Sequence, residues 1–444
     1  MTTLLRALAV SIVLLSATSA RAQSQEWVRQ FGSPGNDLVG SVAVDSSGSI
    51  LVAGSTLGGL DGPNAGDFDV YVTKYDTHGV LQWTRQFGTA ANDRSYGIGL
   101  DSLGSYYVMG ETDGNLEGIN AGGTDLFVRK FDAAGNVQWT RQFGTEDPGE
   151  SLRGGAVTSS GDLFVVGGTA GTLGDSNLGY RDVFVRKYDS SGNLAWTRQF
   201  GSESDEFAAD ISADLLGNVY ITGATSGAVS GTNAGIYDAF IAKYDNAGNP
   251  QWTRQFGTDR ADYAQGVAVD LQGNVYASGN TNGSLFADKL GFADAFLAKY
   301  TPDGDILWAH QFGTAAIESA LSVNADGLGN AFIVGYTSGV LEGVNSGDAD
   351  AYVRKYGPSG DLLWTQQLGT QASDWLIDAA SFASDGQGTY FSAGTTSGSL
   401  AGPIAGGIDV FLVKFSDIVP EPGCLRLALP GLFIFGVMVA RRVR

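Results

Sequence analysis

The amino-acid sequence predicts an all-β fold, a seven-bladed β-propeller of four-stranded antiparallel blades. The first observation is that tryptophans recur at intervals of 56 or 57 residues, at Trp27, Trp83, Trp139, Trp196, Trp252, Trp308 and Trp364. The second is that a glycine and a lysine recur in the same phase, as Gly104 and Lys130 do in the second unit. A constant period of this kind is the signature of a repeat architecture, in which each repeat is one supersecondary unit.

Each unit contains four short segments rich in Val, Tyr, Phe and Trp, a composition typical of β-strands. In the second unit these segments, here named a to d, are residues 96–101, 105–110, 125–132 and 137–143. The turn Asp132-Ala133-Ala134-Gly135-Asn136 joins c to d with residues that suit tight hairpins. Segment c is almost continuously apolar, so we expect neighbouring sheets to cover both of its faces. Radial stacking of such sheets gives a propeller.

The two ends of the repeat region predict that the ring is closed. The first unit begins at strand d, Trp27 to Phe31, and the last ends at strand c, Asp409 to Phe415. Each end therefore has the strand that the other lacks. We expect the N-terminal strand to complete the last blade, which removes the exposed sheet edges of an open array. The propeller is predicted to occupy residues 23–418.

The units also share a set of landmarks, which in the first full unit are Asp69, Lys74-Tyr75-Asp76, Trp83 and Gln86-Phe87-Gly88. In these landmarks the chain resembles bacterial β-propeller proteins that carry the SBBP repeat, over residues 27–415. The resemblance implies the propeller fold. Because that family has no common assigned activity, it implies no catalytic residue.

Residues 1–22 predict a cleavable secretory signal peptide. Arg6 is followed by an apolar run from Ala7 to Leu15 and by the small-residue triplet Ala20-Arg21-Ala22, which is the layout of such a signal. We expect cleavage between Ala22 and Gln23, and therefore an exported protein.

Residues 419–444 follow the repeats and contain Val419-Pro420-Glu421-Pro422, an apolar segment from Leu427 to Ala440 and a basic end. This order is similar to a PEP-CTERM sorting signal. The resemblance implies processing by an exosortase in the inner membrane and a place in the cell envelope, the exopolysaccharide or the biofilm matrix. The expected location is therefore the cell envelope or the extracellular space, after transient anchoring in the inner membrane. A permanent single-span transmembrane anchor is the alternative.

The composition argues against several kinds of chemistry. The chain has 47 acidic and 26 basic residues, a formal charge of -21, whereas nucleic-acid binding needs clustered Lys and Arg. One cysteine, Cys424, and two histidines, His78 and His310, leave little material for a zinc site or a Ser-His-Asp triad. No nucleic-acid partner and no catalytic residue are predicted.

Carboxylates are the remaining candidates for a site, and an acidic residue stands near the expected start of every strand a. On the expected topology this series rings the channel mouth; its members are Asp37, Asp93, Glu150, Glu206, Asp262, Glu318 and Asp374. A second series starts strand c, at Asp69, Asp125, Asp182, Asp238, Asp294, Asp350 and Asp409. One interpretation is calcium binding, because calcium prefers carboxylate and carbonyl oxygens. The interpretation that we favour is structural, with each carboxylate accepting backbone N–H bonds within its turn.

A rigid disc with seven similar loops favours a non-catalytic function in which one loop face binds a polysaccharide or a protein partner. The alternatives are a carbohydrate-active enzyme on a propeller scaffold and a calcium-stabilised adhesion module. An active site would break the repeat symmetry, and the conspicuous departures are Arg153-Gly154-Gly155, Lys289, and Trp375 with Asp378. They form no recognisable catalytic set.

Overall fold

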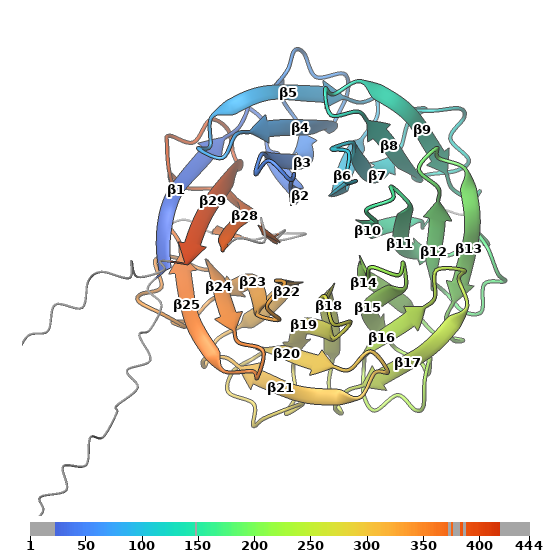
Figure 1. Cartoon of the computed structure of the whole chain (residues 1–444), viewed down its shortest axis with the longest axis vertical. Coiled ribbons are helices and arrows are strands. Elements are labelled where there is room, and N and C mark those ends of the chain that lie inside the picture. Colours follow the sequence, from blue (N-terminus) through green and yellow to red (C-terminus); the bar gives the residue numbers. More distant parts are fainter. Residues whose placement is uncertain (1–22, 147–148, 372–373, 376–381, 385–387, 418–444) are drawn as a thin grey trace, which may run out of the picture.

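The structure, a computed structural model, describes residues 23–146, 149–371, 374–375, 382–384 and 388–417. Every regular element among them is a β-strand, and the strands form seven antiparallel sheets arranged in a ring (Figure 1). The predicted seven-bladed propeller is confirmed. Residues 1–22 and 419–444, with the predicted signal peptide and sorting motif, lie outside the described residues. Among the described residues, no helix has the length and hydropathy needed to span a bilayer.

The strands a line the centre and the strands d form the rim (Figure 1). Strands a are β2 (Asp37–Val44), β6 (Asp93–Leu100), β10 (Ser151–Val157), β14 (Glu206–Ala213), β18 (Asp262–Val269), β22 (Glu318–Ala325), and two pieces in the seventh blade, β26 (Asp374–Trp375) and β27 (Phe382–Ser384). Strands b are β3 (Ile50–Thr56), β7 (Tyr106–Thr112), β11 (Leu163–Thr169), β15 (Val219–Thr225), β19 (Val275–Thr281), β23 (Ala331–Thr337) and β28 (Thr389–Thr396).

The outer half of each blade consists of strands c and d. Strands c are β4 (Asp69–Tyr75), β8 (Asp125–Phe131), β12 (Asp182–Tyr188), β16 (Asp238–Tyr244), β20 (Asp294–Tyr300), β24 (Asp350–Tyr356) and β29 (Asp409–Asp417). Strands d are β5 (Leu81–Phe87), β9 (Val137–Phe143), β13 (Leu194–Phe200), β17 (Pro250–Phe256), β21 (Ile306–Phe312), β25 (Leu362–Leu368) and, in the seventh blade, β1 (Gln23–Phe31).

The innermost strands begin earlier than predicted. In the second blade β6 starts at Asp93, whereas the sequence pattern placed the start at Tyr96. The physical reason is a contact between blades, because the Asp93 backbone N–H donates to the Phe68 carbonyl of the preceding blade at 2.7 Å. The acidic residue itself therefore opens the strand.

The predicted ring closure is confirmed. β1 pairs antiparallel with β29 along its length, with Val28 opposite Val413. Phe31 then packs against Tyr71 and Tyr75 of the first blade, with ring centroids 5.9 Å away in both cases. The seventh sheet is thus built from both ends of the repeat region.

The hydrophobic core lies between neighbouring blades, as the apolar strands c predict. One cluster joins Leu51 and Val70 of the first blade to Val108 and Phe127 of the second, and all four side chains are buried. Burial of apolar surface on both sides of strands b and c is the main stabilising contribution to such a fold. Each blade therefore depends on its neighbours for its core.

The Trp-Thr-Arg-Gln-Phe-Gly segment of strand d connects each blade to the next. In β13, the Trp196 indole N–H donates to the Asn246 carbonyl at 3.1 Å and Arg198 Nε donates to the Gly248 carbonyl at 2.7 Å. Both acceptors lie in the c–d turn of the following blade. The equivalent arginine of β1, Arg29, donates to the Gly79 carbonyl of the first blade at 2.9 Å, so the same bond closes the ring.

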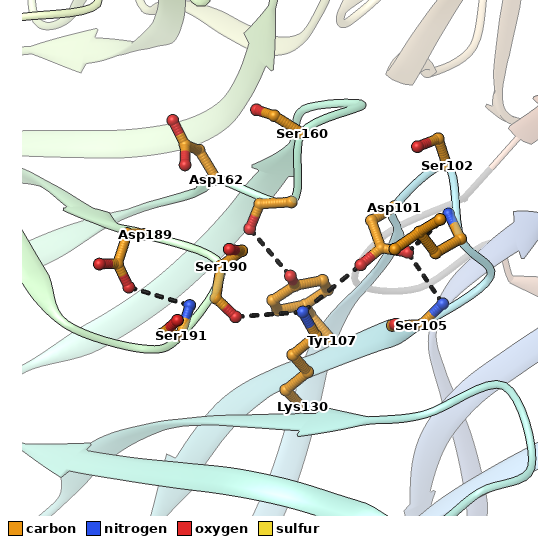
Figure 2. Close-up of polar contacts among 12 residues, drawn as sticks. Asp101, Ser102, Ser105, Tyr107, Lys130, Ser160, Asp162, Asp189, Ser190 and Ser191 are labelled. Carbon is orange, nitrogen blue, oxygen red and sulfur yellow. Dashed lines mark hydrogen bonds and ion pairs between the residues drawn. The ribbon is translucent and has the colours of Figure 1, made fainter.

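The recurring lysine of strand c belongs to the same interface, on the face formed by the a–b and c–d hairpins (Figure 2). Lys130 Nζ lies 3.4 Å from Asp101 Oδ2 in its own blade and donates to the Ser190 carbonyl of the next blade at 3.1 Å. Beside it, the Tyr107 hydroxyl donates to the Gly161 carbonyl at 2.8 Å. The equivalent lysines of five other blades also bond the next blade, whereas Lys74 pairs with Asp45 of its own blade.

Candidate functional site

The first acidic series is buried at the blade junctions. Asp93 is fully buried, and its Oδ2 accepts from the Thr89 backbone N–H at 2.6 Å and from the Thr89 hydroxyl at 2.9 Å. Glu206 accepts from Ser202 in the same way and from the Thr225 hydroxyl at 2.7 Å. Buried carboxylates with such donors are likewise found at Asp37, Glu150, Asp262 and Glu318.

The expectation that this series rings an open channel mouth is therefore corrected for these six residues. They lie at the starts of the innermost strands as predicted: five are the first strand residue, and Glu150 stands immediately before β10. Ser and Thr hydroxyls that follow strand d and end strand b hold the carboxylates inside the blade junctions. Asp374 is the first residue of β26, and its side chain lies outside the described residues. Burial raises the pKa of Asp37, Asp93 and Glu206, and a neighbouring carboxylate adds to this effect in each case.

The second acidic series holds the long b–c loops. Asp69 Oδ2 accepts from the Ala65 backbone N–H and from Gln86 Nε2, both at 2.9 Å. Gln86 Oε1 in turn accepts from the Leu60 backbone N–H at 2.8 Å. The same Gln–Asp bond recurs at Gln30–Asp409, Gln142–Asp125, Gln199–Asp182, Gln255–Asp238, Gln311–Asp294 and Gln367–Asp350. This repeated bond explains the glutamine of the Gln-Phe-Gly landmark.

The described carboxylates of both series thus have backbone, hydroxyl or amide donors, as the structural interpretation requires. Within the described ranges, no group of three or more His, Cys, Asp or Glu side chains is arranged to hold a metal ion. A calcium ion would have to compete with the hydrogen bonds that these carboxylates already accept.

We expect calcium to have little effect on stability. Addition of millimolar calcium or excess chelator should change the melting temperature by less than about 2 °C, because a ligand stabilises the folded state only if it binds there. Thermal unfolding followed by circular dichroism measures this directly. A large calcium-dependent rise that Asp→Asn changes at Asp37, Asp93 and Asp262 abolish would establish the metal interpretation instead.

A cavity of about 560 Å³ occupies the centre of the ring and is lined by the innermost strands. Each described strand a, apart from the two pieces in the seventh blade, carries a β-bulge near its fourth residue. Such bulges re-aim a side chain and are common beside functional sites. Tyr96, Arg153 and Gln265 line the cavity from the bulge positions of the second, third and fifth blades, and Ala209 and Leu321 do so in the fourth and sixth.

Asp210 is the carboxylate of this channel cavity. In the equivalent position the other described blades have only small residues, namely Ser41, Gly97, Gly154, Gly266 and Ser322. Its Oδ2 accepts from the Val267 backbone N–H of β18 at 3.0 Å, and its Oδ1 accepts from the Ile211 N–H at 2.8 Å. Burial raises the pKa of Asp210 to about 7 against the opposing effect of these bonds.

Sequence reasoning identified Arg153 as a departure from symmetry but missed Asp210. The signal was a charged residue four residues after Glu206, in a column that holds Gly or Ser in every other unit except the seventh, which has Asp378. Beside Arg153, Glu111 of β7 accepts from the Leu152 backbone N–H at 2.9 Å. Burial raises the pKa of Glu111, while the charge of Arg153 and a hydrogen bond from Tyr96 act in the opposite direction.

Asp210 should make the stability of the propeller depend on pH. Because its pKa is raised on folding, its favourable contribution is complete below about pH 4 and is lost as pH rises through 7. We expect the free energy of unfolding of the wild type to fall by about 2 kcal/mol between pH 5 and 8, relative to the Asp210→Ser variant. The figure takes about 1.4 kcal/mol per unit of pKa and allows for screening by channel water. Urea unfolding of both proteins at each pH measures the difference, and parallel pH profiles would contradict it.

A second cavity, of about 670 Å³, lies on the face of the b–c loops between the fourth and fifth blades. We call it the loop pocket; its lining includes Ile236, Asp259, Arg260, Asn282, Lys289 and Phe292. The Phe292 side chain is 76% exposed and Ile236 is 61% exposed. Lys289, singled out by the sequence pattern, therefore lines a cavity. Of the other two residues that depart from the repeat pattern, Trp375 is the last residue of β26, and Asp378 lies outside the described residues.

Comparison with known proteins supports the repeat assignment. The model of the β-propeller repeat called SBBP matches residues 26–61, 82–117, 195–229 and 251–287. The regulatory protein FlaEY of Caulobacter vibrioides is 26% identical over 404 residues, which cover 78% of this chain and 41% of that protein. An uncharacterised WD repeat-containing protein of Acanthamoeba polyphaga mimivirus is 21% identical, covering 86% of this chain and 36% of its own length. The chain thus spans about two fifths of these curated relatives.

Solved propellers are similar in fold at low sequence identity. A streptogramin B lyase structure is 11% identical with a TM-score of 0.49, covering 87% of this chain and 97% of that one. A gluconolactonase from Xanthomonas campestris is 15% identical with a TM-score of 0.37, covering 72% and 89%. These likenesses carry no inference about activity.

Proposed function

We propose that this protein is an exported, non-catalytic component of the cell envelope or extracellular matrix that binds an anionic polysaccharide through its b–c loop face. One observation supports this above the others. The loop pocket combines two cationic side chains, Arg260 and Lys289, with the exposed ring of Phe292, in a strongly acidic chain. Its one carboxylate, Asp259, lies 3.8 Å from Arg260 Nε in an exposed pair.

The chemistry of the loop pocket suits acidic sugars. Arg and Lys form charge-assisted hydrogen bonds with carboxylate or sulfate groups, and an exposed aromatic ring offers an apolar face to the C–H groups of a sugar ring. Asn282 adds an amide that can bond hydroxyl groups. The loop is held in place because Gln311 Oε1 accepts from the Leu285 and Phe286 backbone N–H groups at 2.8 and 3.0 Å. A pre-ordered loop loses less entropy on binding.

Binding of the mature protein to a panel of anionic and neutral glycans tests this proposal. Two variants replace a pocket residue with the residue at the equivalent position of another blade. Lys289→Asn introduces the residue found at Asn233, and Arg260→Ala introduces the residue found at Ala91, so the fold should tolerate them. Each should weaken binding of anionic glycans about tenfold, the loss expected for one charge-assisted bond. The control is Leu103→Ser on the opposite face, which introduces the residue found at the equivalent position of the first blade, Ser47. The proposal fails if no anionic glycan binds, or if both loop-pocket variants bind as the wild type and the control do.

The sorting of the protein forms part of the same proposal. The Pro420-Glu421-Pro422 motif would be recognised by an exosortase-type enzyme while residues 427–440 reside in the inner membrane, after removal of residues 1–22. Replacing the three motif residues with alanine should then retain the precursor in the membrane. Intact-mass analysis of the wild-type mature protein provides the check, and a mature chain that still carries residues 419–444 would favour a permanent anchor.

A further inference from the structure

The channel cavity differs from the rest of the propeller because its lining varies from blade to blade. The columns that hold each blade in shape, such as the glutamines of strand d that bond the aspartate of strand c, have the same residue and the same bond in every blade. Around the cavity, by contrast, consecutive blades contribute Tyr96, Arg153, Asp210 and Gln265. The sixth blade contributes Leu321 at the bulge. One side of the channel is therefore polar and able to bind a ligand with a defined orientation.

Arg153 presents its cation to this cavity. It is the bulge residue of β10 and is exposed in a strand whose neighbouring residues are otherwise buried or half-buried. The bond from the Leu152 N–H to Glu111 fixes the backbone immediately before it. The two residues after it are glycines, and the charge of Arg153 lies near enough to the Glu111 carboxylate to oppose the rise in its pKa. The backbone beside Arg153 is thus fixed, whereas its side chain is exposed.

Asp210, on the neighbouring blade, lies close to the residue that follows this arginine. A Cβ atom added to Gly154, the residue after Arg153, would lie 3.2 Å from Asp210 Oδ1. Each carboxylate oxygen of Asp210 accepts one backbone N–H hydrogen bond. A carboxylate can accept about four hydrogen bonds in total. Its oxygens can therefore also accept hydroxyl groups of a ligand in the cavity.

We propose that the central channel binds a small acidic sugar, with the uronate carboxylate on Arg153 and sugar hydroxyl groups on Asp210 and Gln265. Arginine is suited to this role because its planar fork binds carboxylate in a bidentate manner. The cavity of about 560 Å³ falls in the usual range of small-molecule sites, roughly 300 to 1,000 Å³. This site is separate from the loop pocket and does not depend on it.

Titration calorimetry of the full mature protein with glucuronate, glucose and a short glucuronate-terminated oligosaccharide tests the proposal. We expect glucuronate to bind at least about tenfold more tightly than glucose, because only the uronate can pair with Arg153. Tighter binding of the oligosaccharide than of free glucuronate would identify a chain end as the source of the acidic sugar, and equal binding would identify the free monosaccharide. Either result is compatible with the site.

Three variants that exchange residues between blades locate the site. Arg153→Gln takes the residue at Gln265, Gln265→Leu takes that at Leu321, and Asp210→Ser takes that at Ser322. Arg153→Gln should remove the preference for glucuronate over glucose, and the other two should weaken binding of both sugars severalfold. The control Leu103→Ser, at an exposed residue of an a–b turn that lines neither cavity, should leave these affinities unchanged. Equal affinity of the wild type for glucuronate and glucose, or unchanged preference in a folded Arg153→Gln protein, would overturn the proposal.

Discussion

Deletion of residues 23–33 is expected to abolish cooperative folding of the propeller. β29 would lose its pairing with β1 along the whole strand, and its N–H and C=O groups would form an exposed sheet edge. The contact of Arg29 with Gly79 and the ion pair of Glu26 with Lys414 at 2.8 Å would go with it. Because a domain is stabilised by only about 5 to 15 kcal/mol in total, the loss of a complete strand should leave little net stability. Exposed edges should also cause aggregation.

Size-exclusion chromatography and thermal unfolding of the deletion variant provide the measurement. We expect aggregates, or a melting temperature lowered by more than about 15 °C. The matched control removes residues 419–444 from the other end of the chain. Because β29 ends at Asp417, this control should unfold as the intact protein does. A soluble deletion variant with unchanged thermal unfolding would show that β1 does not close the ring.

The substitution Gly88→Ala, which adds a single methyl group, is expected to have the second largest effect on the stability of the propeller. This glycine ends the Gln-Phe-Gly landmark of the first blade, and a Cβ atom there would lie 2.3 Å from Asp69 Oδ1 and 3.1 Å from Asp93 Oδ2. Both carboxylates are buried and hydrogen-bonded, so neither can move without losing bonds. Overpacking of this kind costs about 1 to 3 kcal/mol. We expect Gly88→Ala to lose about 3 kcal/mol, because the collision also disturbs the two carboxylates.

Urea unfolding of Gly88→Ala beside Gly402→Ala measures this effect. A Cβ atom at Gly402 would meet nothing within 4 Å, and its backbone φ is compatible with alanine. The control should therefore unfold within about 0.5 kcal/mol of the wild type. If both variants have the same stability, the glycine of the landmark is not required by the approach of the carboxylates.

Much of the candidate site lay beyond sequence reasoning, because its environment comes from residues far apart in the chain. Lys289 and Arg153 were recognisable, since each departs from its column in the repeat alignment. The pKa of Asp210 is raised by burial in the assembled ring, and one of its two N–H donors, Val267, lies 57 residues away. The inward turn of the acidic residues likewise depends on pairs such as Glu206 and Thr225. Neither contact can be recognised from the residues next to it in the sequence.

The amino-acid sequence by itself determined the number of blades, the order of strands within each blade and the closure of the ring. These properties follow from spacing and from the turn residues, and β9 has the predicted bounds Val137–Phe143 because its flanking turns are local. Only the tertiary structure decided where the innermost strands begin, which carboxylates are buried and which side chains line the channel. Those properties depend on contacts between blades, such as the bond from Asp93 to Phe68, and a contact between blades exists only once the ring has assembled.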